Sequence, residues 1–238
     1  MVETEQLRAQ MIEAAEGQLA ASPDFDIATR SVCEAVGVTQ PVLYRLFGDK
    51  RGLLDAVADH GYERYAQLKA AQEQTGDPVA DLLAGWDGHM AFARDNPALY
   101  QLMFAPRPWS HSRARDRVFD LLVAALVRCA AVGRLRIEPR AAAEMALAAN
   151  VGIALDHIAE PARFDSVERS HRLRDAVFAR VLTESPASDA ARDDEDPVRA
   201  AARRLRAQLQ LAAADALEPE ESALLLRWLD RMTGSGSR

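Results

Sequence analysis

The chain has 238 residues, which is enough for one or two domains with a buried core. Its 29 basic and 36 acidic residues give a formal charge of −7, which excludes a histone-like protein that holds nucleic acid by bulk charge but leaves a local basic patch open. The two cysteines lie far apart, no apolar run approaches the ~18 residues of a membrane-spanning helix, and the acidic start lacks the order of a signal peptide, so we expect a cytoplasmic protein with no disulfide framework and no membrane partner.

Nearly the whole chain is predicted to be helical. Apolar residues recur at spacings of three and four, and glycine or proline stands at the joints. In chain order, the predicted helices cover residues 5–20, 29–36, 39–47, 52–70, 79–95, 97–104, 112–132, 139–159 and 166–185, with two more inside 198–232. We find no alternation of period two that would indicate a strand, so the predicted fold class is all-α.

Composition divides the chain into three predicted parts. They are a helical part at residues 1–65, a second helical part at residues 66–185, and residues 186–238, which contain an acidic linker followed by a helical hairpin. An isolated two-helix hairpin buries too little apolar surface to offset its ordering entropy. We therefore expect the hairpin to pack on residues 66–185 or on a dimer partner.

The most informative pattern lies in residues 27–58, where two short predicted helices meet at Gly37. A glycine at this point can take the positive φ that a sharp reversal of the chain needs. Thr39 is placed to cap the second helix, and Pro41 is tolerated in its first turn. This is the layout of a helix-turn-helix motif.

The exposed face of the second short helix follows from its periodicity. If Leu43, Leu46 and Phe47 point inward, one outward stripe remains, formed by Gln40, Pro41, Tyr44 and Arg45. Gln and Arg side chains pair with adenine and guanine edges, and a Tyr hydroxyl can reach a phosphate. Lys50 falls at the N-terminus of the next predicted helix, where the helix dipole favours a phosphate. An ordinary solvated helix face is the alternative interpretation.

Residues 37–39, 43–47 and 49–54 resemble, in order and spacing, the signature of the TetR family of bacterial transcriptional regulators. The resemblance implies that residues 1–65 are a three-helix DNA-binding domain, the head, which binds double-stranded operator DNA, and that residues 66–185 are the regulatory domain. Its implied DNA contacts are Thr39, Gln40 and Arg45 toward the groove, Tyr44 and Lys50 on the phosphate backbone, and Arg30 close to phosphates. The family's members also imply a helical regulatory region that binds a small-molecule effector and forms a homodimer.

Large apolar and aromatic side chains gather in the middle of the chain, where plain core packing competes with an effector pocket as their role. The pocket candidates are Trp86, His89, Met90, Tyr100, Met103, Phe104 and Phe119. In this family the helices at 139–159 and 166–185 would build a four-helix bundle across a twofold axis; core packing within one chain is the alternative. The candidate knobs of that bundle are Leu173, Val177, Phe178 and Val181.

Together these features predict a ligand-responsive repressor that binds a palindromic operator as a homodimer. Two alternatives stay open: a TetR-like protein whose extended C-terminal region mainly serves a protein partner, and a helical enzyme acting on a small molecule. The sequence contains no nucleophile elbow, phosphate-binding loop, dinucleotide fingerprint or metal-binding box. We therefore expect no catalytic residues, no metal site and no cofactor.

Overall fold

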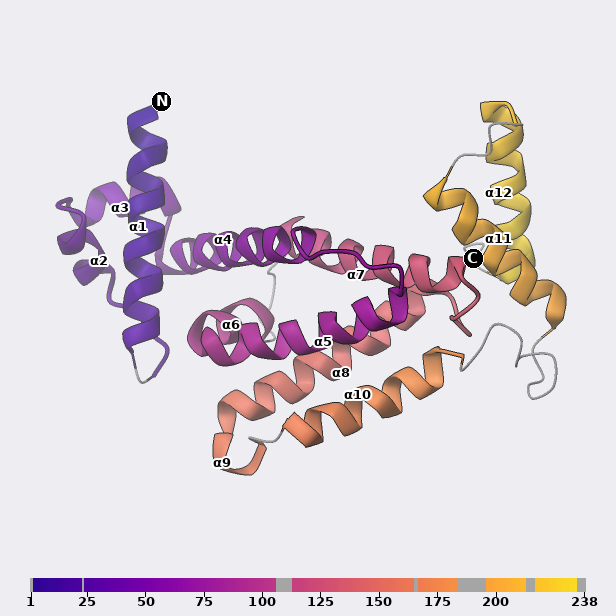
Figure 1. The fold of residues 1–238 in the computed structure, drawn as a ribbon. Coiled ribbons are helices and arrows are strands. Elements are labelled where there is room, and N and C mark those ends of the chain that lie inside the picture. Colours follow the sequence, from indigo (N-terminus) through magenta and orange to yellow (C-terminus); the bar gives the residue numbers. More distant parts are fainter. Residues whose placement is uncertain are drawn as a thin grey trace. The chain divides into compact units, whose positions relative to one another are not determined.

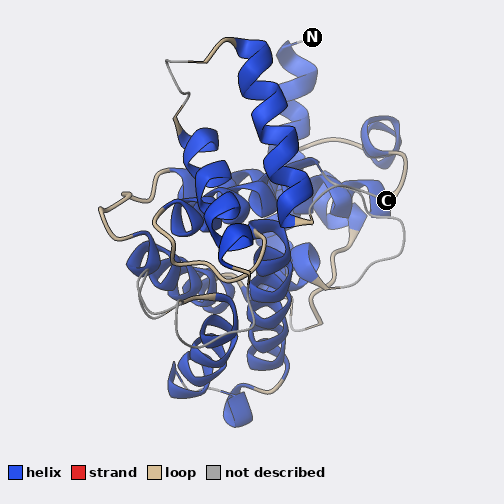
Figure 2. Cartoon of the chain, turned by 90° about the vertical axis from the view of Figure 1, so that its right-hand side faces the viewer, coloured by secondary structure: helices blue, strands red, loops and turns tan. Residues whose placement is uncertain are grey.

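The computed structural model describes residues 2–22, 24–105, 113–164, 167–183, 196–212 and 217–234. Its regular secondary structure there is helical (Figure 2), apart from a single bridge between Leu135 and Leu182. The helices labelled in Figure 1 are α1 (Val2–Ala21), α2 (Thr29–Ala35), α3 (Gln40–Phe47), α4 (Lys50–Ala70), α5 (Pro78–Asp95), α6 (Pro97–Phe104), α7 (Arg113–Ala131), α8 (Pro139–Ala159), α9 (Pro161–Phe164), α10 (Val167–Val181), α11 (Pro197–Leu211) and α12 (Pro219–Thr233). The predicted all-α class is confirmed. None of these described helices is both long and apolar enough to cross a membrane.

The helix bounds follow the sequence periodicity closely. The predicted helix at 139–159 coincides with α8, whereas α1 begins at Val2 rather than at residue 5 and α10 ends at Val181 rather than at residue 185. The short helix α9 was not predicted, because Pro161 was interpreted only as a break. Proline is common at the first position of a helix, and here it begins α9. Most of the predicted acidic linker lies outside the described residues.

The chain divides into two compact units. The first comprises residues 1–72, 89–118 and 154–164. Within it α1, α2, α3 and the start of α4 pack together, and α6 packs against α1 and α4 (Figure 1). The buried stripe of α1 is Met11, Ala15 and Leu19, whose spacing of four confirms the predicted amphipathic helix.

The second unit comprises residues 73–88, 119–153 and 165–238. Within it α11 and α12 form the predicted hairpin, and α11 is tied to the turn between α7 and α8. Arg203 Nε donates to the Leu135 carbonyl at 3.1 Å, and Arg206 pairs with Glu138 at 2.9 Å. Arg206 also pairs with Asp230 of α12. The hairpin therefore packs on the chain's own regulatory region, one of the two surfaces that we expected.

Candidate functional site

The two short helices α2 and α3 are joined by the predicted glycine turn. Gly37 has a φ of 71°, the left-handed conformation that glycine adopts without steric cost. The Val38 amide donates to the Cys33 carbonyl at 3.0 Å and closes the turn. Val32 and Leu43 are buried between the helices, and burial raises the pKa of the Cys33 thiol. The angle between α2 and α3 is thus fixed by a small apolar core.

Thr39 occupies the N-cap position of α3, but its side chain makes no capping hydrogen bond, so this part of the prediction is wrong. Pro41 explains the difference. A capping side chain accepts from the second or third amide of the helix, and Pro41 removes the second. The third amide, of Val42, donates to the Thr39 backbone carbonyl at 3.0 Å instead. The Thr39 hydroxyl is therefore not used by the helix end, and the side chain is exposed.

The outward face of α3 is the one that the periodicity predicts. Gln40, Pro41, Tyr44 and Arg45 are all exposed, whereas Leu43 is fully buried. Tyr44 keeps 45% of its surface exposed. The structure therefore presents an amide, a phenol and a guanidinium side by side on one helix face.

The turn between α3 and α4 brings two backbone segments into close contact. Asp49 caps α4, because its Oδ1 accepts from the Gly52 amide at 2.7 Å. A Cβ added at Gly52 would lie 1.9 Å from the Phe47 carbonyl oxygen, so only glycine fits there. Gly52 lies within the stretch 49–54 that resembles the TetR signature, and no role was predicted for it; a glycine in the first turn of a predicted helix was the available signal.

Both cations that the resemblance places near DNA phosphates already hold a carboxylate. Lys50 Nζ lies 2.6 Å from Asp26 Oδ1, and Arg30 Nε lies 2.8 Å from Glu34 Oε1. The hydrogen bond from Lys50 lowers the pKa of Asp26, and the hydrogen bond with Glu34 raises the pKa of Arg30. The Arg30–Glu34 pair has the spacing of one helical turn and was readable in the sequence. The Asp26–Lys50 pair joins residues that only the fold brings together, so it could not be predicted from the sequence.

Three polar side chains meet inside an aromatic cluster of the first unit. His89 Nδ1 lies 2.7 Å from the Tyr65 hydroxyl, and His89 Nε2 lies 2.5 Å from the Tyr100 hydroxyl. All three residues are buried. Phe104 stacks on Tyr100 with ring centroids 4.5 Å apart, and Phe92 lies against Tyr65 at 4.7 Å. His89 and Tyr100 were among the predicted pocket residues, whereas Tyr65 was not.

The hydrogen-bond chain requires an uncharged His89. Burial lowers the pKa of His89 to about 3, so the imidazole is neutral and has one donor and one acceptor nitrogen. One tyrosine therefore donates to the imidazole and the other accepts from it. The accepting tyrosine keeps its own hydroxyl hydrogen free to donate to a further acceptor. Burial also raises the pKa of both Tyr65 and Tyr100, so both phenols keep their protons.

Two of the other pocket candidates, Trp86 and Phe119, do not join this cluster. Trp86 belongs to the second unit, where Nε1 donates to Ser170 Oγ at 2.9 Å and the indole packs edge-on against Phe178 at 5.8 Å. Phe119 is half-buried, with the Arg140 guanidinium 5.0 Å from its ring centroid. Met90 and Met103 are buried. The structure therefore brings together His89, Tyr100 and Phe104, and places Trp86 and Phe119 in other surroundings.

A second buried polar group lies beside Trp86. Asn150 of α8 is 6% exposed, and its Nδ2 donates to the Trp86 carbonyl at 3.4 Å. Among the described residues, Asn150 Oδ1 has no hydrogen-bond partner. A buried acceptor without a partner costs free energy unless something else supplies a donor. Asn150 was not among the predicted pocket residues. The described residues contain no group of three or more side chains suited to hold a metal ion.

The residues proposed for the dimer bundle are partly used inside one chain. Phe178 and Val181 of α10 are buried in the chain's own core, so these two side chains cannot supply the predicted knobs. Ala142, Ala143 and Ala146, on one side of α8, are buried within the chain as well. The exposed side of α8 carries other small or apolar residues, among them Met145 and Gly152.

Solved structures with the same fold give an independent comparison. A protein of unknown function from Rhodococcus sp. RHA1 is 23% identical, with a TM-score of 0.61 over 74% of this chain and 96% of that chain. SmeT, the repressor of the Stenotrophomonas maltophilia multidrug efflux pump SmeDEF, is 20% identical, with a TM-score of 0.60 over 80% and 97%. The complex of SmeT with triclosan matches at 19% identity and a TM-score of 0.55, over 81% and 99%. No curated protein matches the chain.

The glycine turn, the exposed face of α3 and the helical remainder define the class, which is that of an all-helical helix-turn-helix protein. Residues 82–210, more than half of the chain, match the family described as tetracyclin repressor-like, C-terminal domain. The chain therefore belongs to the tetracyclin repressor-like (TetR) family of transcriptional regulators. Family membership confirms that it is a regulator and not an enzyme. The match ends at residue 210, so it includes almost all of α11 and none of α12.

Proposed function

We propose that this protein is a sequence-specific repressor that binds a palindromic DNA operator as a homodimer and responds to a small molecule. The observation that carries the proposal is the exposed face of α3, with Gln40, Tyr44 and Arg45 on a helix held rigidly by its glycine turn. In a helix-turn-helix protein the second helix lies in the major groove and its outward side chains contact base edges.

Each side chain of this face has a distinct part in the proposal. Gln40 and Arg45 hydrogen-bond base edges and carry sequence preference, since an amide matches adenine and a guanidinium matches guanine. Thr39 offers its unused hydroxyl toward the groove. Tyr44 donates to a phosphate, and Lys50 and Arg30 contribute charge at the backbone, which sets position and affinity without reading sequence.

The direct test selects bound duplexes from a randomised pool, using the full-length wild-type chain. Arg45→Ala and Gln40→Ala should relax the selected sequence, whereas Tyr44→Phe should weaken binding equally for all sequences. Arg94→Ala, which removes an exposed arginine of α5, serves as the control and should change neither property. A wild-type protein that enriches no sequence, even at low salt, would refute the proposal.

The proposed homodimer uses α8 and α10. On α8, exposed small or apolar residues recur at spacings of four and three, at positions 141, 145, 148 and 152. A Cβ at Gly152 would meet nothing within 4 Å in the chain, so a second helix has room to approach closely there. Two reading heads must span half-sites about 34–36 Å apart, which one chain cannot do.

This dimer is tested by light scattering. Gly152→Glu places a charge on the proposed interface and should yield monomers that bind a palindromic duplex poorly. Gly17→Glu, at an exposed glycine of α1, is the matched control and should leave the mass unchanged. A Gly152→Glu protein with the wild-type mass would show that the dimer, if present, uses another surface.

The effector is proposed to be an uncharged small molecule. SmeT binds triclosan in a structure of the same fold. The buried polar groups of the aromatic cluster are neutral, and the Tyr65–His89–Tyr100 chain leaves one hydroxyl hydrogen that can donate to a ligand. Such an effector releases DNA only if it binds the DNA-free conformation more tightly, and the ratio of the two affinities sets the extent of release. Triclosan is the first probe, and calorimetric binding that Tyr100→Phe weakens supports this cluster; binding of equal strength would exclude it.

A further inference from the structure

Carboxylates on the DNA-binding head occupy the groups that the proposed function assigns to DNA phosphates. Asp26 Oδ1 lies 2.6 Å from Lys50 Nζ, and Glu34 Oε1 lies 2.8 Å from Arg30 Nε. Asp49 Oδ1 accepts from the Gly52 amide at the N-terminus of α4. A phosphate seeks the same three partners, namely an ammonium, a guanidinium and the free amides of a helix N-terminus.

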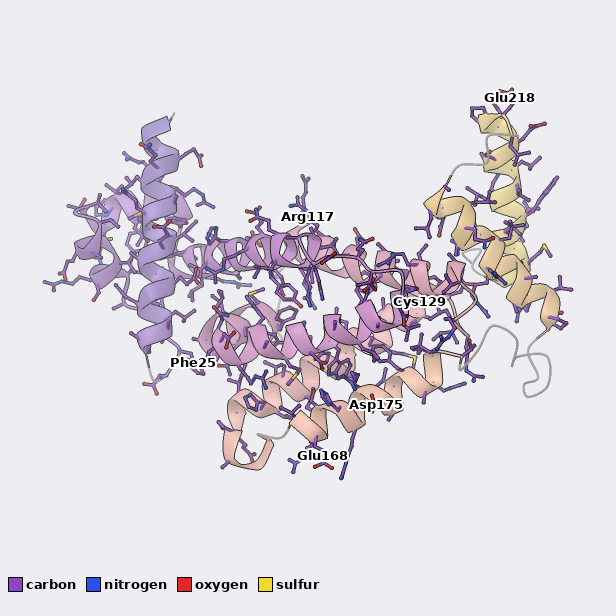
Figure 3. All side chains as sticks on the ribbon, viewed as in Figure 1. Phe25, Arg117, Cys129, Glu168, Asp175 and Glu218 are labelled. Carbon is purple, nitrogen blue, oxygen red and sulfur yellow. The ribbon has the colours of Figure 1, made fainter. Side chains whose placement is uncertain are left out.

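The backbone that carries Asp26 belongs to a structured loop. Phe25, in the loop that follows α1 (Figure 3), has a φ of 53°, the one positive φ among the described non-glycine residues. Its amide donates to the Ser22 carbonyl at 3.2 Å, and the Asp26 amide donates to Ser22 Oγ at 3.2 Å. Ile27, directly after Asp26, is buried. A bulky residue keeps such a conformation only where its surroundings hold it.

We propose that Asp26, together with Glu34, limits the affinity of this head for DNA by acting as an internal substitute for phosphate. The inference rests on the proposed DNA-binding function. Before Lys50 can bind a phosphate it must leave Asp26, and the released carboxylate then faces the incoming phosphate with a like charge. The cost falls most heavily on sequence-independent binding, which consists almost entirely of such phosphate contacts.

A low affinity for DNA of arbitrary sequence agrees with the negative net charge of the head. Residues 1–66 hold six basic and eleven acidic residues, so most of the head repels DNA. Pairing Lys50 and Arg30 with carboxylates removes local attraction as well. The contacts to the DNA phosphates then contribute little binding free energy, so the contacts to the bases must contribute most of it. The chain is therefore released readily from DNA that lacks the sequence contacted by Gln40 and Arg45.

Fluorescence anisotropy with a labelled short duplex of random sequence tests the proposal on the full-length chain. Asp26→Asn should tighten binding at low salt roughly fivefold, and the slope of log affinity against log salt should steepen by about one. Asp24→Asn is the matched control. Asp24 is exposed in the same loop, and its substitution changes the net charge equally. Glu34→Gln should also tighten binding, with Glu13→Gln on the exposed side of α1 as its control.

A double substitution separates this pairing from a general charge effect. In a Lys50→Met background, Asp26→Asn should give no more than the gain of Asp24→Asn, because the lysine that Asp26 neutralises is absent. If Asp26→Asn and Asp24→Asn have the same effect in a wild-type background that binds DNA, the inference is wrong while the proposed function stands. If no variant binds any duplex, both are wrong. Melting temperatures within the wild-type range show that the compared variants are folded.

Discussion

Two regions of the first unit use the same residue types in opposite ways. Tyr44, on the recognition face of α3, keeps 45% of its surface exposed and packs against little, whereas Tyr100 is fully buried and bonded to His89. The charged groups of the head lie at the surface, where each pair contributes little to stability. The polar groups of the aromatic cluster lie in the core, where losing one partner is costly. The proposed function of the head therefore depends on exposed side chains, whereas stability in the cluster depends on buried ones.

The largest expected loss of stability comes from a substitution in the head at which the new side chain would collide with the backbone. Gly52→Ala should destabilise the protein by about 3 kcal/mol or more, because its Cβ would lie 1.9 Å from a carbonyl oxygen that no side-chain rotation can move. Gly17→Ala is the control, since a Cβ there meets nothing within 4 Å; it should stabilise the helix by about 0.5–1 kcal/mol. Chemical denaturation measures both. If Gly52→Ala unfolds at the wild-type midpoint, the close approach of α3 and α4 is not as described.

The next effect is in the aromatic cluster. His89→Leu should cost about 3 kcal/mol, because it leaves the hydroxyls of Tyr65 and Tyr100 buried without a partner. Replacing both tyrosines by phenylalanine in the same chain should recover most of this loss, since no polar group is then stranded. The measurement is the free energy of unfolding of the His89→Leu protein, compared with that of the triple variant, which also carries both Tyr→Phe substitutions. A triple variant less stable than His89→Leu would show that the hydroxyls have other partners.

Acid should weaken the cluster before it affects the recognition face. The pKa of His89 is about 3 in the folded protein, whereas the ordinary value of a histidine, 6.5, applies in the unfolded chain. Below pH 6.5 the imidazole is therefore protonated in the unfolded chain and stays neutral in the folded one. The contribution is constant above that pH. From about pH 6.5 down to about pH 3 stability should fall by roughly 1.4 kcal/mol per pH unit on account of this one group. The His89→Gln protein should lack that component of the slope, and parallel curves for the two proteins would contradict the assignment.

The head was readable from the sequence because local chemistry determines it. Gly37 permits the sharp turn, the spacing of Leu43 from Gln40 and Tyr44 fixes which side of α3 is exposed, and Pro41 is compatible with the first turn of a helix. These signals act over a few residues, so no knowledge of the tertiary fold is needed. The helix at 139–159 was found for the same reason, since Pro139 opens it.

The contacts that the sequence did not show join residues far apart in the chain. Asp26 meets Lys50 only because the loop after α1 returns to the start of α4, and Tyr65 meets His89 only because α4 and the part of α5 from His89 onward belong to the same unit. Helical periodicity says that Tyr65 is buried but not which polar atom it faces. The failure of Thr39 as a cap has a local cause, the missing amide of Pro41, and was within reach of the sequence.

The smallest expected effect on stability is that of substitutions on the exposed face of α3, and it distinguishes this face most clearly from the buried aromatic cluster. Gln40→Ala and Arg45→Ala should change the free energy of unfolding by no more than about 0.5 kcal/mol, because both side chains are exposed and neither belongs to the core. The same variants are expected to alter DNA sequence preference. Thermal unfolding measures the melting temperature, and selection from a randomised duplex pool measures sequence preference. Gln40→Ala and Arg45→Ala should change only the sequence preference, whereas Tyr100→Phe should change only the melting temperature. If Arg45→Ala lowers the melting temperature as much as Tyr100→Phe does, the guanidinium has a structural partner, and the division between an exposed functional face and a buried structural cluster does not hold.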